Sequence, residues 1–368
     1  MSLQEEIDQK SKTIKSDGYS MSIGELASMY KENEVDIHPD FQRIYRWNSE
    51  QKTKLIESIL LGIPIPSIFV AQREDGVWDV VDGLQRLSTI FEFMGILKKD
   101  DGTLWEQLRL QKTNYLPSLD NKVWESNNVD ESLTMTQRLI IKRAKIDIKI
   151  ITRESDSEAK YELFQRLNTN GSALSEQEIR NCLLLMVNKD FYYFINKLSK
   201  NENFLNTVSI TERSIKESYD KELVLRFFIY RYCKPEEISR SQELGTFITE
   251  KMLQFANDKK FDKDKETEIF EGTFKKLNNV LHDDAFRKYD KDIKKFKGPF
   301  SISAFECVIP ALSDCYKTIS DESILNVIKK MWGEELFISN SGAGLRASDR
   351  VKKLIPFGKD LFNEKHDA

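Results

Sequence analysis

The chain has 368 residues, of which 40% are hydrophobic and 32% charged, and its net charge is −4. This length predicts two or three domains with sizeable cores, and the charge argues against a protein whose whole surface coats nucleic acid. No apolar run approaches the roughly 18 residues of a membrane span, and residues 1–16 lack the apolar core of a signal peptide. We therefore expect a soluble, cytoplasmic protein with no membrane partner.

Helix and strand patterns alternate through the first half of the chain. Three residue pairs have capping-box spacing and predict helix starts: Ser22 with Glu25, Asn48 with Gln51, and Ser175 with Glu178. Residues 67–72 and 77–81 predict two strands joined by a turn, and residues 146–150 alternate between isoleucine and charged residues like a half-buried strand. Residues 98–130 predict an irregular insertion.

Strand patterns become scarce beyond about residue 191, where apolar residues recur at helical spacing. We therefore predict an α+β first domain over residues 1–188 and an all-helical second domain over residues 189–368. The charged stretches at residues 258–265 and 290–299 are interpreted as solvated turns between helices.

The segment from Asp82 to Arg86 lies where a strand pattern gives way to a helical run, residues 87–94. Gly83 permits a turn with positive φ, and the first amides of a helix have no intrahelical acceptor, so this junction can bind an anion. Arg86 can grip a phosphate with two hydrogen bonds, and Asp82 can hold a magnesium ion. An ordinary helix cap is the alternative, and the local pattern alone favours it.

Two further polar segments could belong to the same site. Arg43 and Arg46 stand beside Tyr45 and Trp47, so they can reach phosphates or stack on bases, but a surface pair resting on aromatic rings fits equally well. The loop that begins at Asn168 can contact ribose, base or metal, although asparagine and glycine are also ordinary turn formers.

Missing motifs narrow the chemistry. The chain has four cysteines and three histidines, without a CxxC pair, an HExxH pair or a GxxxxGK[ST] sequence. A standard P-loop is therefore excluded. A zinc site and a nuclease with a histidine general base are both hard to build from these residues, because His38 alone lies near the motifs.

Four ordered segments together resemble a known family. Residues 41–47, 63–66, 82–86 and 164–178 are similar in order and spacing to the N-terminal domain of GmrSD-type restriction enzymes. The family pattern Asp, Gly, Gln, Gln, Arg is kept at residues 82–86, except that Leu84 replaces the first Gln. The resemblance covers about residues 20–185 and implies a fold like that of the ParB and sulfiredoxin superfamily, with a small mixed sheet and helices.

The resemblance also implies nucleotide chemistry coupled to attack on foreign DNA. Carried over by position, Asp82 and Arg86 would be catalytic, and Asp82 would hold Mg²⁺. The residues that would bind a nucleoside triphosphate are Arg43, Arg46, Gly83, Gln85, Arg86 and Asn168. A histidine and asparagine nuclease domain follows in many relatives, but its paired pattern is not found here, where the second half contains His282 and His366.

We therefore expect a magnesium-dependent NTPase or nucleotide switch of a phage-defence system, whose helical domain senses DNA or a DNA-bound partner protein. One alternative is a DNA-binding module without catalysis, in which the same arginines and the basic stretch from Arg138 to Lys145 contact the phosphate backbone. A nuclease in its own right is the third hypothesis.

Overall fold

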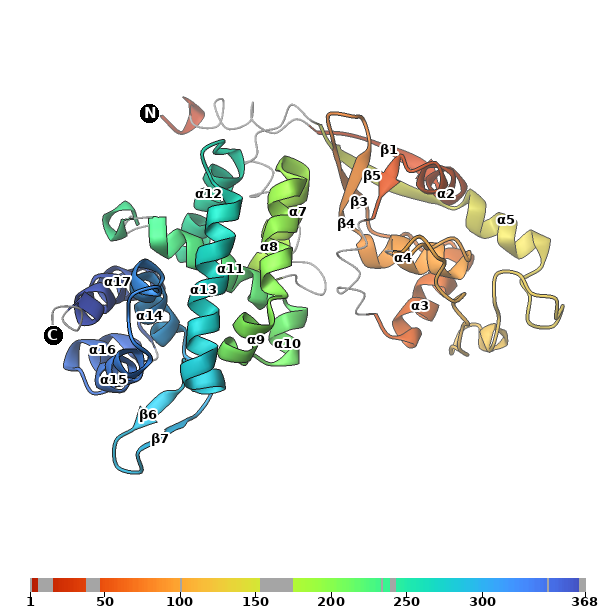
Figure 1. The fold of residues 1–368 in the computed structure, drawn as a ribbon. Coiled ribbons are helices and arrows are strands. Elements are labelled where there is room, and N and C mark those ends of the chain that lie inside the picture. The colour runs from red at the N-terminus through yellow and green to blue at the C-terminus, as the bar shows by residue number, and fades with distance from the viewer. Residues whose placement is uncertain are drawn as a thin grey trace. The chain divides into compact units, whose positions relative to one another are not determined.

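The computed structural model describes residues 2–5, 16–37, 47–99, 101–152, 175–232, 234–238, 243–342 and 344–363 (Figure 1). The chain divides into two compact units, residues 1–173 and residues 174–368. A search of the described ranges for a helix with the length and apolar character of a membrane span finds none.

A mixed five-stranded sheet is the centre of the described part of the first unit. Its strands are β1 (Ser16–Ser22), β2 (Val35–Asp36), β3 (Ile68–Gln72), β4 (Trp78–Asp82) and β5 (Lys145–Ile151), in the order β1-β5-β3-β4-β2. The pairs β1/β5 and β3/β4 are antiparallel, whereas β3/β5 and β2/β4 are parallel. The expected α+β class with a mixed sheet is therefore confirmed.

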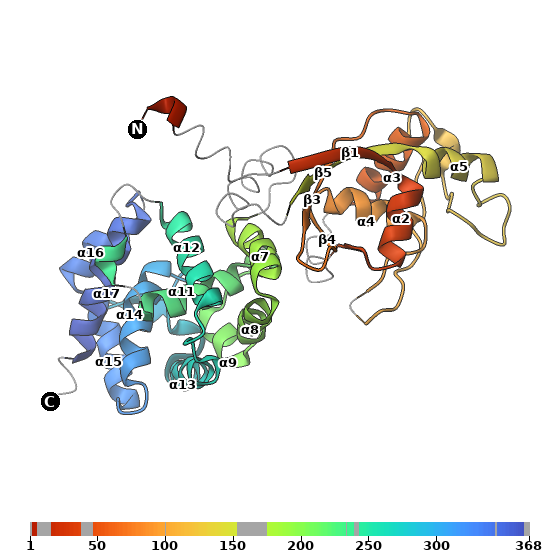
Figure 2. The same cartoon turned by 90° about the horizontal axis from the view of Figure 1, so that it is seen from above.

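Helices cover one face of this sheet (Figures 1 and 2). They are α2 (Ile23–Lys31), α3 (Ser49–Leu60), α4 (Leu84–Phe93) and α5 (Met135–Arg143). The predicted starts are confirmed, because Ser22 accepts from the amide of Glu25 and Asn48 forms a full capping box with Gln51. Strand β5 is half buried as predicted: its isoleucines 146, 148 and 150 are buried, and the charged residues between them are exposed.

The irregular insertion at residues 98–130 belongs to the same core. It contains the short 3₁₀ helix η2 (Pro117–Leu119), and its residues Leu108, Leu110, Leu119 and Trp124 are buried together with those of the sheet and helices. The ring of Trp124 meets Phe93 of α4 edge to face, with 5.8 Å between the ring centres. The insertion therefore closes the core beside α4.

The second unit is mainly helical in its described residues. Its helices are α7 (Glu176–Val187), α8 (Lys189–Ser199), α9 (Glu202–Val208), α10 (Glu212–Lys216), α11 (Tyr219–Tyr232), α12 (Leu244–Asn257), α13 (Lys263–Leu281), α14 (Ile302–Cys315), α15 (Asp321–Met331), α16 (Glu335–Ser341) and α17 (Ala347–Asn363), with the 3₁₀ turns η4 (Pro235–Glu237) and η5 (His282–Asp284). The capping box of Ser175 with Glu178 at the start of α7 is confirmed.

The prediction of an all-helical second half is wrong at one place. Residues 288–297 overlap the stretch 290–299 interpreted as a solvated turn, and they form an antiparallel hairpin of β6 (Lys288–Asp290) and β7 (Lys295–Lys297). The physical reason is the cross-strand pair of Tyr289 and Phe296, whose ring centres lie 5.0 Å apart. The many charges around these two rings hid the strand signal.

Helix α7 packs within the second unit. Arg180 of α7 is fully buried, and its Nη2 donates to Oε2 of Glu222 on α11 at 2.7 Å. Its Nη1 also donates to the carbonyl of Gly245 on α12 at 3.3 Å. The expected boundary between residues 188 and 189 therefore lies one helix downstream of the division between the two compact units.

Buried ion pairs link four helices of this unit. Glu222 of α11 binds both Arg180 of α7 and Arg226, while the fully buried Glu306 of α14 accepts two hydrogen bonds from Arg350 of α17 at 2.6 and 2.9 Å. Burial opposes ionisation of Glu222, but Arg226 and Arg180 hold the pKa of its carboxyl below the ordinary value. Each of these charges depends on its partner, because an unpaired buried charge is strongly destabilising.

The turn between β4 and α4 requires glycine for two reasons. Gly83 has φ 98° and ψ 9°, in the left-handed region that L-residues rarely adopt. A Cβ atom there would lie 2.7 Å from Cγ1 of Ile68 on β3, which is too close. Gly76, in the turn between β3 and β4, offers a comparison: its φ is 88°, but a Cβ there meets nothing within 4 Å.

These two glycines predict different costs of substitution. Gly76→Ala has only the strain of an alanine in the left-handed backbone conformation. We expect it to lower the free energy of unfolding by about 1–2 kcal/mol. Gly83→Ala must also displace Ile68, so we expect a loss of about 2–4 kcal/mol. Urea denaturation of the two variants measures the difference, and equal losses would contradict the importance of the contact with Ile68.

Helices α3 and α4 are joined by a largely buried ion pair. Nζ of Lys52 lies 2.8 Å from Oε2 of Glu92, and the two side chains are 12% and 10% exposed. Burial lowers the pKa of Lys52 to about 8 and raises the pKa of Glu92 to about 7. Burial thus favours the neutral form of each group and their contact favours the charged forms, so each group is tolerated because the other is present.

Removing Lys52 should increase the dependence of stability on pH. The pKa of Glu92 is higher in the folded protein than its ordinary value of 4.5, so protonated Glu92 favours folding and this contribution is lost as pH rises through about 7. In Lys52→Met the carboxyl has no cation, and we expect a small loss at pH 5 that grows to about 3 kcal/mol at pH 8.

The control is Lys54→Met on the same helix. Lys54 pairs with Glu50 at 2.7 Å, but their side chains are 63% and 67% exposed. Such an exposed pair contributes little to stability, so this variant should show a small loss without a comparable pH trend. Chemical denaturation across this pH range tests both variants, and parallel pH curves for Lys52→Met and the unmodified protein would refute the expectation.

Candidate functional site

The candidate site is the junction where β4 ends at Asp82 and α4 begins at Leu84. Gly83 is the N-cap residue, and it supplies no side-chain hydrogen bond to the first turn of the helix. No side chain at the N-cap position therefore competes for the first backbone amides of α4, and the helix dipole adds partial positive charge there. These are the properties of an anion site.

Helix α4 begins three residues earlier than the predicted run of residues 87–94. The left-handed conformation of Gly83 turns the chain directly into the helix, so Gln85 and Arg86 belong to its first turn. Leu87, Ile90 and Phe91 are buried and fix the helix against the sheet. The side chains of residues 85 and 86 are thereby attached to a rigid element.

Arg86 ties α4 to the segment before β3. Its Nη1 donates to the carbonyls of Pro66 and Ser67 at 2.5 and 3.0 Å, and its Nη2 donates to Oδ2 of Asp82 at 2.6 Å. The Arg86 side chain is 12% exposed, whereas that of Asp82 is 43% exposed. Arg86 is thus part of the local architecture, and the Asp82 carboxylate is the more accessible group.

Gln85 connects the site to the segment before α3. Its side-chain oxygen accepts a hydrogen bond from the amide of Trp47 at 3.3 Å. Arg43, Arg46 and Asn168 lie outside the described residues. The structure therefore brings together Asp82, Gly83, Gln85 and Arg86 of the predicted site, whose roles toward a ligand stay predictions.

Asp82 is the candidate metal ligand. No group of three or more His, Cys, Asp or Glu side chains with the arrangement of a metal site occurs within the described residues. Magnesium bound with a nucleotide needs one or two carboxylates, because phosphates and water supply the remaining oxygen ligands. The accessible Asp82 carboxylate beside helix amides has the donor chemistry that such an ion and its phosphates require.

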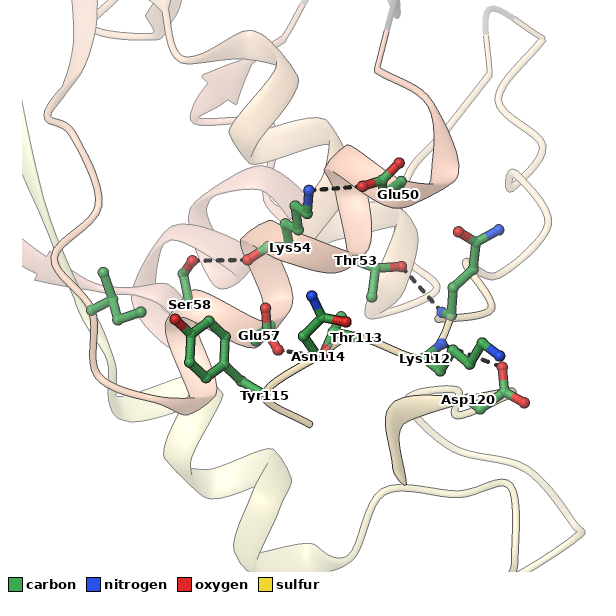
Figure 3. A pocket seen from close by; sticks show the side chains of 12 residues that line it. Glu50, Thr53, Lys54, Glu57, Ser58, Lys112, Thr113, Asn114, Tyr115 and Asp120 are labelled. Carbon is green, nitrogen blue, oxygen red and sulfur yellow. Dashed lines mark hydrogen bonds and ion pairs between the residues drawn. The ribbon is translucent and has the colours of Figure 1, made fainter. Parts of the chain in front are cut away.

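A separate cavity of about 790 Å³ lies between α3 and the insertion (Figure 3). Its lining residues are Glu50, Thr53, Lys54, Glu57, Ser58, Ile63, Gln111, Lys112, Thr113, Asn114, Tyr115 and Asp120. The hydroxyl of Thr113 donates to Oε1 of Glu57, and the hydroxyl oxygen of Thr53 accepts from the amide of Gln111 at 3.1 Å. None of these residues belongs to the Asp82–Arg86 junction.

The sequence reasoning missed this cavity, because its two walls are distant in sequence and the insertion has no periodic pattern. One signal of this cavity was present on α3. Thr53 and Glu57 are polar residues one helical turn apart, and both are buried on α3, with 1% and 7% exposure. Buried polar groups need partners, and here the insertion supplies them.

The basic stretch from Arg138 to Lys145 is partly engaged inside the first unit. Arg138 pairs with Glu125 of the insertion at 2.6 Å, and Nζ of Lys142 lies 6.0 Å from the ring centre of Trp124. Arg143 and Lys145 are exposed. This stretch therefore helps to hold the insertion against α5.

The segment that contains the junction is similar to a known protein family. A search of curated proteins finds no match. Residues 23–185 match the profile of the family described as GmrSD restriction endonuclease, N-terminal domain. The match includes Asp82–Arg86, and the resemblance predicted from the four ordered segments is therefore confirmed over residues 23–185.

Proposed function

We propose that this protein binds a nucleoside triphosphate at the start of α4 and acts in a restriction-type defence system directed against foreign DNA. The observation that carries the proposal is the start of α4 at a glycine N-cap, which makes no side-chain hydrogen bond, beside the accessible Asp82 carboxylate. This junction lies within the segment that matches a restriction endonuclease family. A phosphate group suits the helix amides, and its counterion suits Asp82.

Each residue of the junction has a proposed role. The amides of the first turn of α4 and the guanidinium of Arg86 would bind phosphate oxygens, and Asp82 would hold the magnesium ion. Magnesium would supply neutralisation of the phosphate charge. Arg43, Arg46 and Asn168 would complete the site from the two segments that the structure does not describe.

The pair formed by Asp82 and Arg86 would respond to such a ligand. In the structure the two side chains satisfy each other at 2.6 Å. A magnesium nucleotide carries a cation that attracts Asp82 and phosphates that attract Arg86, so it offers both groups new partners of opposite charge. In an NTPase, Arg86 would stabilise the negative charge on the transferring phosphoryl group, and Asp82 would hold the magnesium ion that neutralises part of that charge.

The rival hypothesis is a DNA-binding module without catalysis. It depends on cations near α5, of which Arg138 and Lys142 already contact the insertion. It has less support in the first unit for that reason. A nuclease activity of its own is supported by the name of the matching family.

Substitution of Asp82 tests nucleotide binding. We expect one of the four common ribonucleoside triphosphates, with magnesium, to raise the melting temperature, because a ligand at 100 times its Kd stabilises the folded state by about 2.7 kcal/mol. Asp82→Asn should remove the magnesium dependence of that shift. A thermal-shift screen with and without magnesium provides the measurement.

The matched control is Glu131→Gln, which also takes a carboxylate from an arginine, since Glu131 accepts from Nη1 of Arg109 at 2.8 Å. This variant should keep the full response. The proposal fails if no nucleotide raises the melting temperature, or if Asp82→Asn responds like the unmodified protein.

Arg86 should affect both folding and binding. Arg86→Ala removes three hydrogen bonds that join α4 to Asp82 and to the segment before β3, so we expect a loss of about 1–3 kcal/mol in the nucleotide-free protein. Calorimetric titration at a temperature where the variant is fully folded should show loss of nucleotide affinity as well. Unchanged affinity in the folded variant would exclude Arg86 from phosphate binding.

A further inference from the structure

The hairpin of β6 and β7 is a local concentration of positive charge. Residues 287–297, here called the basic hairpin, contain six basic and two acidic side chains, a net charge of +4 in a chain whose net charge is −4. Its exposed lysines are Lys288, Lys291, Lys294, Lys295 and Lys297. In Figure 1 the two strands extend away from the neighbouring helices.

The basic hairpin is held in shape from within and from one side. A two-stranded hairpin alone is marginally stable in water, so it needs such support. Tyr289 and Phe296 pair across the strands, and Nζ of Lys329 on α15 lies 5.4 Å from the ring centre of Tyr289. Oδ1 of Asp290 accepts from the amides of Asp292 and Ile293 and so fixes the turn.

The acidic partners within reach neutralise few of these cations. Asp290 pairs with Lys297 at 2.5 Å, and Asp283 pairs with Arg287 at 2.9 Å. Among the described residues, no ion pair is found for the other four exposed lysines, which are Lys288, Lys291, Lys294 and Lys295. The carboxylate of Asp292 stands exposed among them. Four like charges on one small element repel one another, and a polyanion would relieve that repulsion.

We propose that the basic hairpin enters the major groove of duplex DNA, where its lysines bind the phosphate backbone. The inference deepens the proposed function, on which it rests for DNA as the target. The major groove of B-form DNA is about 12 Å wide and admits a two-stranded ribbon, which the deep, narrow major groove of an RNA duplex does not. Ile293, 55% exposed in the turn of the hairpin, offers an apolar contact to thymine methyl groups.

The test compares two triple variants that remove the same charge. Lys291→Gln/Lys294→Gln/Lys295→Gln alters the basic hairpin, and Lys259→Gln/Lys260→Gln/Lys265→Gln alters exposed lysines around the start of α13. Fluorescence anisotropy with a short labelled DNA duplex, over a series of salt concentrations without nucleotide, gives the slope of log affinity against log salt. We expect the magnitude of this slope to be smaller by about 2–3 in the hairpin variant and unchanged in the control variant.

Two results would overturn the inference: equal slopes and affinities for the two triple variants, or no DNA binding by the unmodified protein at low salt. A duplex RNA of the same sequence bound as tightly as the DNA would overturn the assignment to the DNA major groove. Circular dichroism and urea denaturation verify that both variants are folded.

The nucleotide thermal shift separates this inference from the proposed function. Hairpin-dependent DNA binding without any nucleotide response would leave the inference standing and refute the nucleotide site. A nucleotide response without hairpin-dependent DNA binding would refute the inference alone.

Discussion

The close approach of the β4–α4 turn to β3 is the constraint on which the candidate site depends. Gly83 passes so near Ile68 that a Cβ atom has no room, and its left-handed backbone directs the chain straight into α4. The first amides of the helix and the Asp82 carboxylate therefore lie together on one rigid turn, here called a corner of the fold. Such a corner needs little rearrangement to meet a ligand.

Arg86 of the candidate site has a structural role. Its guanidinium binds two backbone carbonyls before β3 and the carboxylate of Asp82. In the proposed complex it would keep its place on α4 while sharing its charge with phosphate. The effect of removing this side chain therefore has to be measured on both folding stability and ligand binding.

The sequence predicted the elements whose signals are local. The capping boxes at Asn48 and Ser175 and the alternating isoleucines of β5 were correct because each depends on neighbours within a few residues. The start of α4 was placed three residues late, because a left-handed glycine as N-cap lacks the usual side-chain signal. The likeness to a ParB and sulfiredoxin fold stays a prediction.

The cavity beside α3 and the hairpin of β6 and β7 escaped prediction. The cavity lies between α3 and a non-periodic insertion, so the sequence of one wall does not predict the position of the other. The hairpin depends on Tyr289 meeting Phe296 across a turn, and the surrounding charges resembled those of a solvated loop. For the candidate site, the sequence predicted a role for the Asp82–Arg86 segment, which stays a prediction, but it did not predict the hydrogen bonds that already occupy Arg86.

Helix α7 belongs to different parts of the chain by sequence similarity and by packing. Its sequence falls almost entirely within the segment that matches the restriction endonuclease family, which ends at residue 185, yet its fully buried Arg180 has its ionic partner on α11. A fragment ending at residue 185 would carry this arginine and the apolar face of α7 without the helices that cover them. The family match and the first compact unit therefore end at different places in the chain.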